Sequence, residues 1–140
     1  MSPASVLRCV SLGLVVLFSA ACFPTGGLPR APFADVPLPP DATPYTNDWV
    51  YIDTPTAVAA KLVYLSLPGV HEATAAFRSR MIRSGWKEEK TAVLQRPPPE
   101  PPLTVMEFAK GMDTCRITLE ATSAGTHVEI TIARLKTPSR

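Results

Sequence analysis

The sequence predicts a two-layer α+β sandwich, with one helix covering an antiparallel sheet of about four to five strands. One segment, residues 70–84, carries apolar side chains at three- and four-residue intervals, the period of an amphipathic helix. Downstream of it, three segments alternate apolar with polar side chains, which is the period of half-buried strands. The 140 residues also include an apolar stretch at 9–21 and eight prolines between Pro24 and Pro55, so roughly 85 residues remain to form one domain.

The first predicted strands precede the helix. Trp49–Ile52 is a short β-prone run that ends before Pro55. Ala57–Leu67 is a longer run with apolar side chains on both of its alternating faces. A strand with two apolar faces is typical of the interior of a sheet, so we expect Ala57–Leu67 to be a central or well-covered strand.

The helix is predicted over residues 70–84, with Val70, Ala73, Phe77 and Met81 on its buried face. Gly85 follows the last turn and can adopt the left-handed conformation that ends many helices. We expect Trp86 to fold back onto Met81, which is the apolar contact of a Schellman motif.

The strands after the helix form a meander. Residues 86–96 predict one ragged strand, and Pro97–Pro102 is a stiff loop that cannot join a ladder of hydrogen bonds. The three alternating runs place the following residues on the buried side of the sheet: Thr104, Met106 and Phe108, then Cys115, Ile117, Leu119 and Ala121, then Val128, Ile130 and Ile132. Turns are expected at Lys110–Asp113 and Ser123–Thr126.

The N-terminus has the pattern of an export signal, which we assign to residues 1–21. Arg8 supplies the positive region, residues 9–18 are apolar, and Ser19–Ala21 are the small residues that a signal peptidase accepts. A transmembrane helix needs about 20 apolar residues, and this run is several residues shorter. Export is therefore the better interpretation.

The segment Phe18–Cys22 resembles the lipobox of bacterial lipoproteins, with Ser19 where that family usually has leucine. The resemblance implies that the leader is removed and that Cys22 is lipidated, which anchors the chain in a membrane. The next residue is Phe23 and not the aspartate that commonly retains such lipoproteins in the inner membrane. The resemblance therefore implies an outer-membrane location facing the periplasm.

Residues 22–48 are predicted to be the lipidated cysteine followed by a proline-rich tether, residues 49–136 the α+β domain, and residues 137–140 a tail. The proline density of the tether excludes a regular helix or strand period. Asp35–Pro40 mixes apolar side chains with prolines. We weigh two interpretations of it, an arm ordered along the domain and a polyproline ligand for a partner, and favour the ordered arm.

The domain also resembles a group of small, mostly uncharacterised bacterial lipoproteins with a single helix and a Gly-Trp helix stop. The matching residues are Asp35–Val36–Pro37, Phe77 with Met81, Gly85–Trp86, Phe108–Ala109–Lys110–Gly111 and Cys115. Arg78 and Ser84 stand where that group usually has Tyr and Asn. The resemblance spans roughly residues 33–134, implies the fold and the location, and transfers no catalytic residue.

The sequence offers no catalytic, cofactor-binding or metal site, so we predict that the protein is not an enzyme and binds no cofactor. His71 and His127 are isolated and are expected at the surface, and Glu88 with Glu89 is a poor acid–base pair because neighbours on a strand point to opposite faces. Cys115 is expected to be a small buried hydrophobe. The 14 basic and 12 acidic residues are nearly balanced, which speaks against nucleic acid as a partner.

The densest charged group is basic and comprises Arg78, Arg80, Arg83, Lys87 and Lys90. A solvated helix end explains it adequately. The functional alternative is contact of Arg78, Arg80, Arg83 and Lys87 with the phosphates of anionic lipid or lipopolysaccharide.

Two functions of different classes remain open. The first is a lipid-anchored, non-catalytic interaction or structural module of the cell envelope, with a protein partner of unknown identity. The second is a carrier of a small ligand or lipid, with a pocket between the helix and the sheet. A carrier predicts a cavity bounded by Phe77, Met81 and Trp86, whereas a filled core there favours the module.

Overall fold

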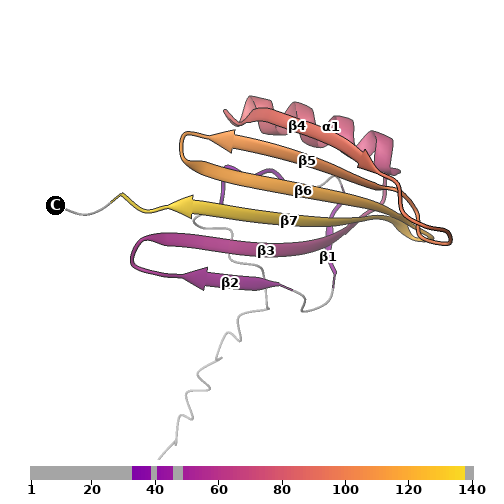
Figure 1. Cartoon of the computed structure of the whole chain (residues 1–140), viewed down its shortest axis with the longest axis horizontal. Coiled ribbons are helices and arrows are strands. Elements are labelled where there is room, and N and C mark those ends of the chain that lie inside the picture. Colours follow the sequence, from indigo (N-terminus) through magenta and orange to yellow (C-terminus); the bar gives the residue numbers. More distant parts are fainter. Residues whose placement is uncertain (1–32, 39–40, 46–48, 138–140) are drawn as a thin grey trace, which may run out of the picture.

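The computed structural model describes residues 33–38, 41–45 and 49–137. Its main feature is a seven-stranded antiparallel sheet with one α-helix on one of its faces (Figure 1). The strands are β1 (Thr43–Pro44), β2 (Val50–Asp53), β3 (Ala57–Ser66), β4 (Lys87–Leu94), β5 (Leu103–Lys110), β6 (Asp113–Thr122) and β7 (Gly125–Leu135). Their order across the sheet is β1-β3-β7-β6-β5-β4, and β2 also pairs with β3.

The helix α1 (Val70–Arg83) carries the chain from β3 to β4, at the opposite edge of the sheet. Strands β4 to β7 then return as a meander, and β7 pairs with β3 along its whole length. The predicted antiparallel sheet with one covering helix is confirmed. The predicted central position of residues 57–67 is also correct, because β3 has β7 on one side and β1 and β2 on the other.

The expected strand number of about four to five is wrong, since the sheet has seven strands. The strand without a sequence signal is β1, which lies inside the proline tract. Pro44 lacks an amide proton, but β1 lies at an edge of the sheet, where a missing donor is tolerated. Asp41, with a φ of 47°, precedes this short strand, and the amide of Tyr45 extends the pairing by donating to the carbonyl of Val63 at 3.0 Å.

The helix ends as its sequence predicts. Gly85 has a φ of +84°, a conformation that costs little only for glycine. The amide of Trp86 donates to the carbonyl of Met81, and that of Gly85 donates to the carbonyl of Ile82, both at 3.0 Å. These are the two hydrogen bonds of a Schellman motif. The observed helix is one residue shorter than the predicted range of 70–84.

The space between helix and sheet is filled with apolar side chains. The helix contributes Ala73, Phe77 and Met81, all of which are fully buried. The predicted inward faces of β5, β6 and β7 are buried as expected, with the exception of Ala121, which is exposed. The core also includes Phe33, Val36, Val58, Ala60, Leu62, Tyr64 and Trp86.

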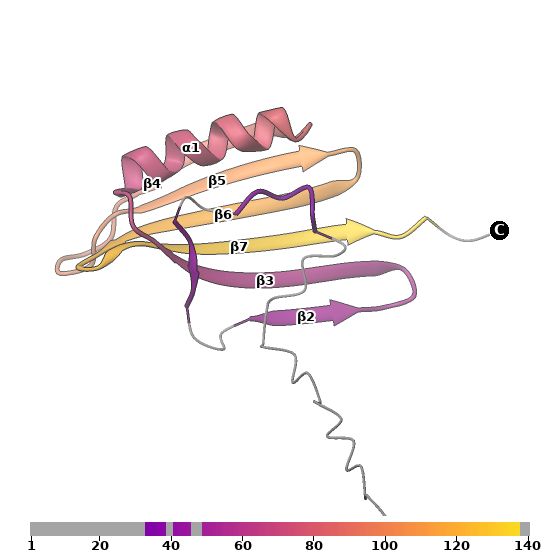
Figure 2. The same ribbon diagram turned by 180° about the vertical axis from the view of Figure 1, so that it is seen from behind.

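Residues 33–38 form an ordered arm beside the helix, on the same face of the sheet (Figure 2). Phe33 and Val36 are buried in the core, and a turn between them is closed by the amide of Val36 donating to the carbonyl of Phe33 at 3.0 Å. The ordered arm, favoured over the polyproline ligand, is confirmed for these residues. The core thus includes residues that precede position 49, the predicted start of the domain.

The second proline cluster is the loop between β4 and β5. Arg96 Nε donates to the carbonyl of Pro101 at 2.8 Å, and the amide of Glu100 donates to the carbonyl of Pro97 at 3.1 Å. The loop joins two neighbouring strands and does not divide the domain. The predicted raggedness of β4 corresponds to a bulge between Glu88 and Lys90, where its register with β5 shifts.

Candidate functional site

The face of the sheet opposite the helix is not covered by any described element, and it is the candidate interaction surface. Two solvent-open hollows lie on it, with volumes of about 340 Å³ and 560 Å³. We call the smaller one the β4–β5 groove; it is lined by Lys90, Ala92, Leu94, Leu103, Val105, Glu107, Arg116 and Thr118. The larger one lies over β5, β6 and β7 and shares Glu107, Arg116 and Thr118 with the groove.

Strand pairing arranges the groove in rows that run across the strands. Lys90, Glu107 and Arg116 form a charged row at one end. Ala92 and Val105 form an apolar row next to it with Thr118, and Leu94 pairs with Leu103 at the far end. Successive rows on one face are about 7 Å apart, so the groove matches the length of an extended segment of about five residues.

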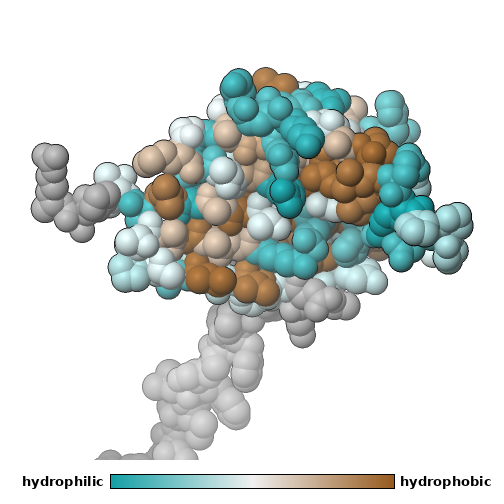
Figure 3. All heavy atoms as spheres, in the orientation of Figure 1, coloured by the Kyte–Doolittle hydropathy of each residue, from teal (hydrophilic) through white to brown (hydrophobic). Residues whose placement is uncertain are grey.

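Figure 3 shows the apolar end of this surface as a hydrophobic area near the ends of β4 and β5, bordered by hydrophilic side chains. Leu94 contributes to this end of the groove, and its neighbour Val93 on the same edge strand is also exposed. No described strand pairs with the outer side of β4. The apolar end of the groove is therefore continuous with a strand edge, a combination that suits an extended peptide.

Glu107 and Arg116 form the ion pair of the charged row, with 2.7 Å between Oε1 and Nη2. Both side chains are more than one-third exposed, so the pair contributes at most about 1 kcal/mol to stability. Lys90 makes no ion pair with any described residue. Breaking the Glu107–Arg116 ion pair therefore costs little free energy. Its side chains and Lys90 can bind a carboxylate or an amide of a partner instead.

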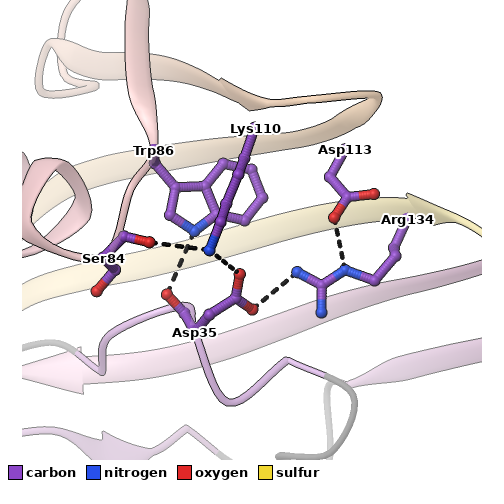
Figure 4. A network of polar contacts seen from close by, with 6 residues as sticks. All are labelled: Asp35, Ser84, Trp86, Lys110, Asp113 and Arg134. Carbon is purple, nitrogen blue, oxygen red and sulfur yellow. Dashed lines mark hydrogen bonds and ion pairs between the residues drawn. The ribbon is translucent and has the colours of Figure 1, made fainter.

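On the helix side, Asp35 of the arm is the centre of a polar network (Figure 4). Its two carboxylate oxygens contact Lys110 Nζ at 2.9 Å and Arg134 Nη2 at 2.7 Å. Arg134 Nε in turn donates to Asp113 Oδ2 at 2.7 Å. Trp86 Nε1 donates to the backbone carbonyl of Asp35 at 3.2 Å, which fixes the arm to the residue that ends the helix.

The charged groups of this network stabilise one another in their ionised forms. Burial is the largest single influence on Asp35 and acts to raise its pKa, but hydrogen bonds and charges from Lys110 and Arg134 outweigh it, so the pKa lies below its ordinary value of 3.8. Burial lowers the pKa of Arg134, and the hydrogen bonds that it donates to Asp35 and Asp113 reverse this effect and raise the pKa. Lys110 Nζ also donates to the carbonyl of Ser84, at 2.9 Å. Asp35 is therefore ionised near neutral pH and bound on both sides.

The network brings three distant segments of the sequence together. The Asp35–Pro37 arm, the Gly85–Trp86 helix end and Lys110 of the Phe108–Gly111 segment meet at this one place. The ammonium of Lys110 lies 5.9 Å from the centre of the Trp86 ring, and Val36 and Phe108 belong to the same core. These three segments together attach the arm to the domain.

Three of the four residues predicted to contact anionic phosphates are engaged within the domain. Arg78 binds both carboxylate oxygens of Glu88, at 2.8 Å and 3.1 Å, and this hydrogen bonding raises the pKa of Arg78 and lowers that of Glu88. Arg80 Nη1 donates to the carbonyl of Leu38 in the arm at 2.9 Å. The exposed Lys87 pairs with Glu89 at 3.0 Å.

Arg83, the fourth of these residues, is exposed and has no ion pair with a described residue. The structure therefore does not gather Arg78, Arg80, Arg83 and Lys87 into one free cationic site.

The other residues that the sequence singled out, one cysteine and two histidines, are not brought together in one place. Cys115 is 2% exposed, and burial, with a smaller contribution from Asp35, raises its pKa to about 12. His71 is exposed at the start of α1, and the ring of His127 contacts that of Tyr45 at 5.2 Å. Among the described residues no group of three or more metal-ligating side chains occurs. Cys22, the predicted lipidation site, lies outside the described residues.

The side chains around which a carrier would need its pocket are part of the filled core. Phe77, Met81 and Trp86 are 0–2% exposed and belong to one apolar cluster with the strands. Neither hollow of the open face is lined by any of the three. Within the described part of the chain, no helix is long and apolar enough to cross a membrane.

Neither the β4–β5 groove nor the Asp35 network was predicted from the sequence. The available signal for the groove was the apolar character of Leu103 and Val105 on the side of β5 assigned to solvent. No local signal identifies the network, because Asp35 is separated by 75 residues from Lys110 and by 99 from Arg134.

Comparison with known proteins adds no relative to these observations. The chain matches no family model, and searches of curated proteins and of solved structures gave no match either.

Proposed function

We propose that this protein is a lipid-anchored protein of the cell envelope whose domain is a non-catalytic interaction module. The observation that carries the proposal is the contrast between the two faces of the sheet. One face is closed by α1 and the arm, whereas the other presents the β4–β5 groove with its apolar end open to solvent. Exposed apolar surface beside a free strand edge is typical of a site for another protein chain.

The anchor in this proposal is Cys22. The lipobox resemblance of Phe18–Cys22 and the export signal before it support lipidation, and Phe23 supports the outer membrane, facing the periplasm, as the destination. Several acyl chains on one cysteine anchor a protein stably, whereas a single chain does so only marginally. The domain then needs no membrane-spanning segment of its own to stay at the membrane.

The geometry favours the module over the carrier. A carrier of a small ligand encloses most of the ligand's surface in a pocket. The space between helix and sheet is occupied by Phe77, Met81 and Trp86, and the two hollows described above lie on the open face. A shallow, partly apolar surface of this kind buries a peptide segment or a protein face better than a small molecule.

Site-specific photocrosslinking in cells tests the module. We would place a photoreactive amino acid at Ala92 or Val105 in the groove and, as a matched control, at Ile82, which is exposed on the outer face of α1. We expect a discrete adduct with one envelope protein from the groove positions and none from Ile82. Equal adducts from all three positions, or adducts with lipid alone, would refute the groove as the binding site.

The anchor is tested separately by mass spectrometry and membrane fractionation. We expect the membrane-extracted protein to begin at Cys22 and to carry the mass of its acyl chains. The Cys22→Ser variant should move to the soluble periplasmic fraction while its domain stays folded. If that variant stays in the membrane fraction, the proposed anchor is wrong.

A further inference from the structure

We propose that the edge of the sheet formed by β1 and β2 lies against the lipid surface, as a second membrane contact beside the lipid at Cys22. We call this surface the β2 edge and define it by four exposed apolar or aromatic side chains, Tyr45, Trp49, Val50 and Ile52. The inference rests on the proposed function, because it assumes that Cys22 carries the lipid anchor. It adds an orientation of the domain relative to the membrane.

The first argument is the composition of the β2 edge. Val50 and Ile52 are 50% and 53% exposed, although both are strongly apolar. They share one face of β2 by strand alternation, and this face is continuous with the open face of the sheet. Tyr45 and Trp49 accompany them, and Tyr and Trp are the side chains enriched where a protein meets the headgroup region of a bilayer.

The second argument is the place at which the anchored segment enters the domain. Phe33 is the first described residue after Cys22, and its ring contacts the ring of Tyr51 in β2, with 6.3 Å between the ring centres. The 11 residue steps from 22 to 33 span at most about 40 Å when fully extended. A domain of about 100 residues has a radius of gyration near 13 Å. The segment therefore keeps Phe33, and with it β2, within about one domain diameter of the anchored cysteine.

The third argument is electrostatic. Two ion pairs of described residues lie next to the β2 edge: Lys61 with Glu129 at 2.7 Å, and Lys136 with Asp53. Their carboxylates are therefore neutralised, which reduces the repulsion that an anionic bilayer exerts on acidic residues. The tether also holds the domain at a high effective concentration near the bilayer, so a shallow contact of four side chains suffices.

The opposite edge of the sheet provides an internal comparison. Strand β4 also exposes two apolar side chains, Val93 and Leu94, at 57% and 49%. This edge carries Lys87, Glu89 and a bulge, and it lies across the whole sheet from β2. If the β2 edge lies at the membrane, the β4–β5 groove lies at the opposite edge of the sheet, distant from the contact, where a soluble or membrane-anchored partner can reach it.

The test uses the chain from Cys22 onward, which contains every described residue, attached to vesicles through the Cys22 thiol. A maleimide headgroup lipid forms the link, and the buried Cys115 does not compete for it. The vesicles contain phosphatidylethanolamine, phosphatidylglycerol and a fraction of lipid with brominated acyl chains, which quench tryptophan on contact. Of the two tryptophans, Trp86 is buried and Trp49 is exposed, so we expect quenching of Trp49 alone.

The Trp49→Phe variant supplies the Trp86 background and should show no quenching. Equal emission of the wild-type chain with brominated and unbrominated lipid overturns the proposal. So does the formation of dimers through the β2 edge, measured by crosslinking on the vesicles, when it occurs without quenching.

A matched pair of double variants checks the side chains. In the unanchored Cys22→Ser chain, Val50→Ser with Ile52→Ser removes apolar surface from the β2 edge, and Val93→Ser with Leu94→Ser removes a similar amount from the β4 edge. Each of these side chains is about half exposed and gains about half of its transfer free energy on insertion. We expect the first pair to lower vesicle binding roughly ten-fold and the second to leave it unchanged. Equal effects of the two pairs would contradict a specific β2 contact.

The lipid anchor and the β2 membrane contact can be refuted independently of each other. Because the vesicle attachment is chemical, absence of lipid on Cys22 in cells refutes the anchor and leaves the quenching result intact. Unquenched Trp49 refutes the membrane contact and leaves the anchor intact. Urea unfolding of each double variant checks that the domain is folded in both tests, and we expect a similar, modest loss of stability in the two because the replaced side chains are all about half buried.

Discussion

Replacing Asp35 by Asn isolates the contribution of the arm to stability. The carboxylate of Asp35 contacts Lys110 at 2.9 Å and Arg134 at 2.7 Å, and the Lys110 side chain is 37% and the Arg134 side chain 21% exposed. An exposed ion pair contributes up to about 1 kcal/mol, and a hydrogen bond to a charged group in a partly buried site about 1.5 kcal/mol or more. We assign about 1 kcal/mol to the more solvent-screened Lys110 pair and about 1.5 kcal/mol to the Arg134 pair.

Asparagine keeps one acceptor oxygen, so the expected loss is about 2 kcal/mol at neutral pH, or about 10 °C in Tm for a domain of this size. Urea unfolding measures it, with the emission of Trp86 as the reporter, because Trp86 is buried and donates to the carbonyl of Asp35. The control is Asp41→Asn, which removes the same charge from an exposed residue that forms no ion pair with a described residue. Asn also tolerates the positive φ of Asp41.

The effect of Asp35→Asn should depend on pH in a defined direction. The pKa of Asp35 is lowered in the folded state, so its stabilising contribution is complete above its unfolded pKa and disappears as the pH falls through the folded pKa. The difference between wild type and variant should be full at pH 7 and vanish below the folded pKa. Equal stability of Asp35→Asn and Asp41→Asn at pH 7 would refute the network as the attachment of the arm.

Further predictions concern positions where the geometry decides the outcome. Gly125→Ala should destabilise the fold by at least about 3 kcal/mol in urea unfolding, because the added Cβ would lie 2.3 Å from the carbonyl oxygen of Ser66 at a φ of +138°. Gly111→Ala, at a φ of +63° with open space around it, should cost only about 1 kcal/mol, and equal effects of the two variants would contradict this reasoning. Cys115 should react with a thiol reagent at pH 8 only in the unfolded protein, because burial raises its pKa to about 12; rapid labelling of the native protein would show that the core opens.

Features that depend on neighbouring residues were predictable from the sequence. The helix and its end follow from the spacing of Phe77 and Met81 and from Gly85 with Trp86, all within one short segment. The meander likewise follows from alternation and short turns. These elements are specified by local periodicity and backbone preference, which a single sequence displays directly.

Features that depend on distant partners were not predictable. Strand β1 forms because β3 offers it an edge, and its two residues, Thr43 and Pro44, are too few to show an alternating pattern. No neighbouring residue in the sequence marks Asp35 and Arg134 as partners, and only the fold brings Asp35 Oδ1 to 2.7 Å from Arg134 Nη2. The basic residues beside the helix end were dense enough to suggest a phosphate contact, but Arg78 has Glu88 as its partner, which no helix-face pattern reveals.

The position of the arm also changes the geometry of the proposed anchor. If the domain began at residue 49, 26 residues would separate it from Cys22, and a flexible tether of that length would let it turn freely. Because Phe33 and Val36 are buried and Asp35 is bound at both carboxylate oxygens, the spacer is reduced to residues 23–32.

Under the proposed anchor, ten residues separate Cys22 from Phe33, which lies beside Tyr51, so the distance between the domain and the membrane is limited. The arm is not a candidate binding surface, because Phe33 and Val36 are buried in the core and Asp35 is bound by Lys110 and Arg134. The surfaces that the arm and helix leave open include the β2 edge, near the point where the anchored segment enters, and the β4–β5 groove at the far edge of the sheet.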